Sequence, residues 1–155
     1  MFNSMVTSSL ARYGSDRTMQ VRMSANMLFS EIMNRGKRIM FLQQLLGKQN
    51  KLQTLAQAKN GTRSIEKQGG KIIAIAIEKI VGSESRVHDF DNHFRPLVNH
   101  TRDRWVSIAI ARHQGINLPP VELIQVGEEY FVRDGHHRVS VAKTFGQATI
   151  EAQVL

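Results

Sequence analysis

The stretch Glu129-Tyr-Phe-Val-Arg-Asp-Gly-His-His-Arg-Val-Ser-Val-Ala-Lys-Thr-Phe-Gly146 decides the fold. A short apolar strand over 130–133 runs through Asp134 into Gly135, and a helix is expected over 137–145. This junction brings backbone N–H groups, a glycine and a cation to one point. Helix N-termini attract anions through unpaired N–H groups and through the helix dipole. The junction therefore predicts a phosphate site or another anion site.

The rest of the C-terminal part supplies the elements that would surround this junction. Pattern and turn residues predict strands over 72–77, 121–126 and 149–154, a helix over 97–113, and an irregular segment over 81–96. The strand over 121–126 and the strand over 130–133 form a predicted hairpin with its turn near Gly127. The order strand, helix, strand, strand, helix, strand predicts an α/β (α+β) body with a mixed sheet over 71–155.

The N-terminal part reads as a basic helical arm over 18–59, preceded by a flexible terminus over 1–17 and followed by a polar linker over 60–70. Apolar residues recur at helical spacing from Val21 to Leu46, and Gly36 either breaks or kinks the run. Five methionines thicken the apolar side. They predict adaptable packing against the body or another subunit, and a lipid-facing helix is the alternative.

Composition limits the chemistry and the partners of the 155-residue chain. The net charge is +8, and residues 1–60 hold most of the excess, with nine Lys/Arg against Asp16 and Glu31. A polyanion or an acidic partner near the N-terminus is one explanation, and a solvated helix face is the other. The absence of cysteine excludes disulfides, thiolate nucleophiles and Cys-ligated zinc. No apolar run reaches the roughly 20 residues that span a bilayer, so a cytoplasmic location without membrane association is expected.

The body resembles the ParB/sulfiredoxin superfamily, in particular the small ParB-like proteins that lack a helix-turn-helix domain. The resemblance covers roughly 72–155. It rests on Asp134-Gly135-His136-His137-Arg138, which is similar to the phosphate-binding box of the family, and on Ser83-Glu-Ser-Arg-Val-His-Asp-Phe90, which lies where the family has its other box. The less specific run Leu46-Gly-Lys-Gln-Asn-Lys-Leu52 is similar to the helical arm of some bacterial members.

The resemblance implies that Asp134, Gly135, His136, His137 and Arg138 form a phosphate-binding box, and that Arg86 reaches the same anion from the facing loop. The alternative is that Asp134-Gly135 is only a turn and helix cap, with Arg138 bridging to a carboxylate. Superfamily members bind CTP or ATP, so a nucleotide (CTP, ATP or ADP) is the expected ligand, with or without Mg²⁺. Two departures limit the transfer. His-His-Arg replaces the Glu-Arg-Arg of CTP-binding partition proteins, and the cysteine of sulfiredoxin is absent.

Glu84 is the candidate catalytic residue, because phosphoryl transfer to a hydroxyl needs a carboxylate within reach of the acceptor. The alternative is a solvated glutamate paired with Arg86. Asp89 and Asp91 either hold Mg²⁺ through water or cap a turn, and the cap is the preferred interpretation. No metal site is predicted, since the histidines have no His-x-x-x-His spacing.

Three functions follow from these patterns. The first is a nucleotide- or phosphate-binding protein, with weak NTPase or phosphotransferase activity through Glu84. The second is a non-catalytic, nonspecific DNA-associated module that uses the basic arm, whose binding would depend strongly on salt. The third is an interaction protein that forms a homo-oligomer through the methionine-rich arm.

Overall fold

The computed structural model describes the backbone of residues 3–48, 50–59 and 70–155, and the side chains of these ranges from Asp16 onward. Most of the predicted linker over 60–70 therefore lies outside the described residues. The body is built on one six-stranded mixed sheet with the strand order β1-β3-β5-β4-β6-β2. Its strands are β1 (Gln53–Thr54), β2 (Ile72–Ala76), β3 (Ile80–Ser83), β4 (Val121–Val126), β5 (Glu129–Asp134) and β6 (Thr149–Val154).

Two antiparallel pairs and three parallel pairs make up the sheet. The hairpin strands β4 and β5 are antiparallel, as are β2 and β6, whereas β1 with β3, β3 with β5, and β4 with β6 are parallel. Because β3 and β5 run in the same direction, their carboxyl ends meet at one edge of the sheet. Ser83 and Val132 are register partners there, so the loop after β3 lies beside the junction after β5.

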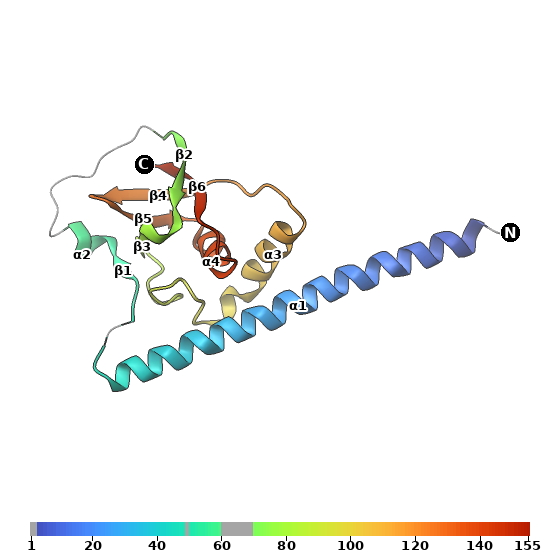
Figure 1. Cartoon of the computed structure of the whole chain (residues 1–155), viewed down its shortest axis with the longest axis horizontal. Helices are drawn as coiled ribbons and strands as arrows, with labels where there is room; N and C mark the ends of the chain where they lie inside the picture. The colour runs from blue at the N-terminus through green and yellow to red at the C-terminus, as the bar shows by residue number, and fades with distance from the viewer. Residues whose placement is uncertain (1–2, 49, 60–69) are drawn as a thin grey trace.

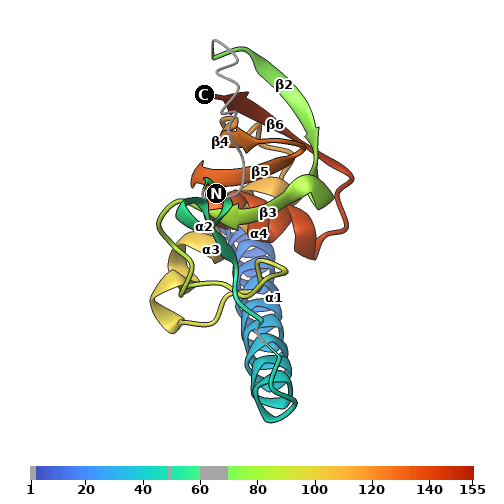
Figure 2. The ribbon, with the colours of Figure 1, turned by 90° about the vertical axis from the view of Figure 1, so that its left-hand side faces the viewer.

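The helices lie outside the sheet (Figure 1). They are α1 (Asn3–Leu45), α2 (Leu55–Lys59), α3 (Arg102–His113) and α4 (His136–Thr144), with 3-10 turns η1 (Ile77–Lys79) and η2 (Asn99–Thr101). Helix α4 contacts α3, and α3 contacts α1. The view turned by 90° also places α1 beyond the sheet, on the side of these two short helices (Figure 2).

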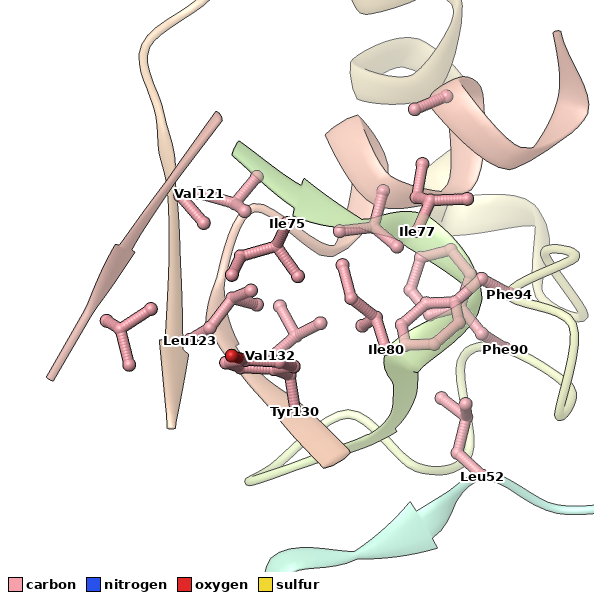
Figure 3. Close-up of a cluster of buried hydrophobic side chains, with 14 residues drawn as sticks. Leu52, Ile75, Ile77, Ile80, Phe90, Phe94, Val121, Leu123, Tyr130 and Val132 are labelled. Carbon is pink, nitrogen blue, oxygen red and sulfur yellow. The ribbon is translucent and has the colours of Figure 1, made fainter. Parts of the chain in front are cut away.

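The main core joins the sheet to α4 and to the segment around Phe90 and Phe94, both fully buried (Figure 3). A second cluster joins α1 to α3 and α4. In it the rings of Phe29 and Trp105 meet edge to face with centroids 5.7 Å apart. The indole Nε1–H of Trp105 donates to Ser140 Oγ at 2.9 Å. This bond fixes α3 against α4.

The predicted α/β body with a mixed sheet and a helical arm is confirmed as a fold class. Strands β4, β5 and β6 begin and end within about one residue of their predicted positions, and so does helix α4 after Gly135. No helix of the described residues is long and apolar enough to cross a membrane.

The arm differs from the prediction at its start and at Gly36. Helix α1 begins at Asn3, so it includes most of the terminus that was expected to be flexible. It also passes through Gly36 without interruption. A Cβ at Gly36 would lie 3.3 Å from Arg95 Cβ and 3.4 Å from a methyl group of Leu97. This glycine therefore allows the body to approach the helix closely, instead of ending the helix.

Two short strands were missed. Strand β1 was assigned to the arm, but it pairs with β3 and so belongs to the sheet. Strand β3 lies partly in the segment that was predicted as irregular. Gly82 permits their pairing, because a Cβ there would collide with the Phe131 ring and with the carbonyl oxygen of Gln53. A glycine makes such a short strand hard to predict from the sequence, because glycine has a low strand propensity.

Candidate anion site at the N-terminus of α4

The junction between β5 and α4 has the geometry of an anion site. Strand β5 ends at Asp134, Gly135 has a φ of 96°, and α4 begins at His136. A φ of this sign favours glycine, which explains the residue type. The N–H of Val139 donates to Gly135 O at 3.0 Å and so makes the first bond of the helix. The amides of His136, His137 and Arg138 precede that bond and are the ones that a helix leaves unpaired.

A cavity of about 420 Å³ opens beside these amides. Three segments that are distant in sequence line it: the loop after β3, one face of α3, and the junction itself. Its lining residues are Arg86, Arg104, Ser107, Ile108, Leu118, Pro119, Asp134, Gly135, His136, His137 and Arg138. The structure thus brings Arg86 to the same cavity as all five residues of the predicted box.

His136 is buried and connects the junction to β3. Its Nε2 lies 2.7 Å from Ser83 Oγ. The same Oγ accepts the N–H groups of Ser85 at 3.1 Å and Arg86 at 2.9 Å. Two donors occupy both lone pairs of the hydroxyl, so its own hydrogen points to Nε2, and His136 carries its proton on Nδ1. Burial, helped by the positive charge of Arg86, lowers the pKa of His136 to about 4.

His137 is buried against an aromatic ring. Its ring meets Phe90 edge to face with centroids 5.6 Å apart. Its Nε2 has no hydrogen-bond partner among the described residues. Burial, together with the charges of Arg86 and Arg104, lowers the pKa of His137 to about 4. A buried polar atom without a partner costs roughly 1–3 kcal/mol, so this nitrogen lowers the stability of the folded chain.

Arg138 does not extend into open space as a phosphate fork would. Its Nη1 donates to Pro119 O at 3.0 Å, and its Nη2 forms an ion pair with Asp134. Only 13% of the side chain is exposed. A Cβ at Gly135 would lie 2.9 Å from the guanidinium. Arg138 and Asp134 therefore hold the junction in shape, and Gly135 leaves the room that the guanidinium occupies.

The cations that remain accessible come from the other two segments. Arg86 lies at an ion-pair distance of 3.3 Å from Asp89, and 47% of its side chain is exposed. Arg104 is exposed and forms no ion pair within the described part of the chain. Sequence reasoning missed Arg104. No local pattern marks it, because its place at the cavity depends on how α3 packs.

Glu84 lies apart from this cavity. It is not among the lining residues, and its two carboxylate oxygens accept Nε of Arg133 at 3.0 Å and Nη2 at 3.3 Å. The expected alternative, a paired loop glutamate, thus has Arg133 as its partner in place of Arg86. Asp91 is buried and accepts the N–H groups of His93 and Arg95, as well as Nε of Arg95. These bonds make Asp91 a cap, as preferred from the sequence.

The described residues contain no group of three or more His, Asp or Glu side chains that could hold a metal ion. Of the two histidines at the junction, His136 forms a hydrogen bond with Ser83, and His137 contacts the Phe90 ring. A divalent cation at this site would have to arrive with the phosphates of a ligand, as Mg²⁺ does when it retains several waters.

Comparisons with known proteins give one weak likeness. No protein-family model matches the chain, and no curated protein matches it. Among solved structures, the chain is similar to the crystal structure of sulfiredoxin from Arabidopsis thaliana, at 19% identity and a TM-score of 0.42. The match covers 55% of this chain and 84% of that chain. The geometry of the site, and not this likeness, supports the function proposed below.

Proposed function

We propose that the chain binds a nucleotide or another phosphorylated ligand through a phosphate group, at the N-terminus of α4. The observation that carries this proposal is the cavity of about 420 Å³ whose wall combines Arg86, Arg104 and the first residues of α4. Helix α4 begins in that wall, and a helix leaves its first N–H groups unpaired. A phosphate oxygen would supply the acceptor that this group of donors lacks.

The charges around the cavity suit an anion. Arg86 and Arg104 are cationic, and the N-terminal end of α4 adds the positive end of a helix dipole. Both histidines are neutral at pH 7, because their pKa values lie near 4. A bound phosphate would favour the protonated imidazoles and raise these pKa values. Ligand affinity is therefore expected to increase as the pH falls from 7 toward 5, provided that the fold persists.

Binding, rather than turnover, is the function that the geometry favours. A volume of about 420 Å³ falls within the range of small-molecule sites. Glu84 is paired with Arg133 and does not line the cavity, so it offers no free carboxylate to an acceptor hydroxyl there. The resemblance of the box to nucleotide-binding relatives makes CTP, ATP and ADP the first ligands to test, with and without Mg²⁺.

A second function, nonspecific association with DNA, is favoured by the exposed cations of α1. Arg17, Arg22, Arg35, Lys37 and Arg38 are exposed, with Asp16 and Glu31 as the exposed carboxylates of the same segment. Binding through this surface would weaken steeply with added salt and would not depend on the junction residues. Filter binding at several salt concentrations, with and without the Arg104→Ala substitution, distinguishes it from the first function.

The test of the first function is calorimetric titration with CTP, ATP, ADP and inorganic phosphate at pH 7. Arg104→Ala should weaken binding roughly tenfold or more, because one hydrogen bond to a charged group contributes about 1.5–3 kcal/mol. Lys79→Ala removes an exposed cation that does not line the cavity, so affinity should stay the same. Absence of binding by every ligand at millimolar concentration would contradict the proposal.

A further inference from the structure

Helix α1 carries an exposed apolar stripe on the side that faces away from the body. The stripe consists of Met23, Met27, Phe41 and Leu45, which are between 57% and 71% exposed. The buried residues of the same helix, Ala25, Phe29, Met33 and Gly36, contact the body instead. The stripe thus has two apolar ends, which flank a polar centre of Ser30, Glu31, Asn34, Lys37 and Arg38 on the same side of the helix. Exposed apolar patches mark interaction surfaces. Figure 1 shows α1 extending past the body toward its N-terminal end.

The stripe is symmetric about Asn34. Met27 and Phe41 lie seven residues to either side of Asn34, and Met23 and Leu45 lie eleven residues to either side. With about 100° of rotation per residue, all four point within roughly 20° of the direction of Asn34. A row that reads the same from both ends fits a two-fold axis through Asn34, because an isologous interface pairs one patch with itself.

The charges along the stripe fit the same arrangement. Glu31 and Arg38 both flank the stripe on one edge, at roughly 40–60° from the direction of Asn34. A two-fold axis at Asn34 places Glu31 of one chain opposite Arg38 of its partner, and the pair occurs twice. Both side chains are exposed, and neither forms an ion pair within the described part of the chain.

We propose that two copies of the chain form an antiparallel dimer through α1, with Asn34 of each chain at the two-fold axis. Met27 then packs on Phe41 of the partner copy, and Met23 packs on Leu45. The polar centre around Asn34, with its two Glu31–Arg38 pairs, fixes register and orientation, as polar residues do between packed helices. The two bodies lie on the outer sides of the helix pair, since each body contacts the opposite face of its own α1.

The absence of cysteine makes this register directly testable by disulfide formation. Asn34→Cys should cross-link to itself upon oxidation. Met27→Cys alone should remain a monomer on a denaturing gel, because the two copies of residue 27 are separated by fourteen helical rises, roughly 21 Å. A mixture of Met27→Cys and Phe41→Cys should give the mixed dimer. Self-linking of Met27→Cys would indicate a parallel pair and would overturn the proposal.

Mass measurement by light scattering over a concentration series tests the dimer without cross-linking. Leu45→Ser should raise the dissociation constant roughly a hundredfold, because a symmetric interface loses two buried leucines. Leu46→Ser is the matched control, since it is 72% exposed against 69% for Leu45 but points about 100° away from it. Equal effects of both substitutions, or a monomer up to several hundred micromolar, would overturn the proposal.

The effects of salt and lipid distinguish a dimer from a chain that binds lipid as a monomer. The two ends of the stripe are apolar and α1 carries excess positive charge. Relief of the repulsion between the two helices should outweigh the weakening of the Glu31–Arg38 pairs, so the dimer should become tighter at higher salt. Association with anionic vesicles of phosphatidylglycerol should be absent or should compete with dimer formation. A chain that stays monomeric and binds these vesicles through the methionines would show that lipid, and not a second copy, covers the stripe.

Discussion

Replacing His137 with leucine should separate stability from ligand binding. In the native chain the imidazole is buried with an unpaired Nε2 and contacts Phe90 with its edge. Leucine has a similar volume and removes the polar atom, which recovers roughly 1–3 kcal/mol. The lost ring contact costs roughly 0.5–1.5 kcal/mol. The free energy of unfolding at pH 7 is therefore expected to stay the same or to rise by up to about 2 kcal/mol.

The same substitution should change the acid sensitivity of the fold. The pKa of His137 is about 4 in the folded chain and 6.5 for an ordinary histidine. Between these values the unfolded chain takes up a proton that the folded chain does not, so stability falls as the pH drops from 6.5 to 4. A difference of this size corresponds to roughly 3 kcal/mol per histidine. His136 contributes in the same direction, so His137→Leu should remove about half of the loss.

Urea denaturation at pH 7, 5.5 and 4.5, followed by circular dichroism, measures both effects. Phosphate and ATP titrations at pH 7 on the same variant should show weaker binding, because the cavity wall loses a polar side chain. His137→Leu would refute this reasoning if it kept the full acid-induced loss of stability. Ligand binding by this variant as tight as that of the native chain would also refute the reasoning, since His137 would then have no role in the site.

Three further predictions concern the fold and the site. Gly135→Ala should cost roughly 2–4 kcal/mol, since its φ is 96° and its Cβ would lie 2.6 Å from a methyl group of Val121. Gly127→Ala, also at positive φ but with nothing within 4 Å, should cost only about 1 kcal/mol in the same urea melts; similar costs would contradict the close approach. Ser140→Ala leaves the Trp105 Nε1–H unpaired in the core and should cost roughly 1–3 kcal/mol. A cost near zero by thermal melting would mean that this bond does not hold α3 against α4. Glu84→Gln should leave the calorimetric affinity for ligand within about twofold, and a tenfold loss would restore Glu84 to the site.

The sequence predicts the elements that have a local signature and misses those that depend on distant partners. Strands β4 to β6 and helix α4 follow apolar patterns with a glycine or proline shortly before or after them, so their positions could be predicted. The two residues of β1 form a strand only because β3 lies beside them. Gly82 hides β3 for a related reason, since its lack of a side chain matters only where Phe131 approaches.

The candidate site also contains some residues that the sequence predicts and others that it does not. Gly135 and the two histidines follow from the strand-to-helix junction, and the resemblance adds Arg86. Arg104 could not be predicted, because its place at the cavity depends on how Trp105 packs against Phe29 and Ser140. The bond from Arg138 to the Pro119 carbonyl was also hidden, since Pro119 lies nineteen residues away on a different segment. The pairing of Arg138 with Asp134 fits the alternative expectation of a guanidinium bridged to a carboxylate.

The amide chemical shifts of the junction test the central claim most directly. In a ¹⁵N-labelled chain titrated first with inorganic phosphate and then with ATP at pH 7, the amides of residues 135–138 and the imidazole of His137 should shift together and saturate. Arg104→Ala should move the midpoint to higher ligand concentration. Shifts confined to the exposed cations of α1, with the amides at the start of α4 unchanged, would contradict an anion site at this helix.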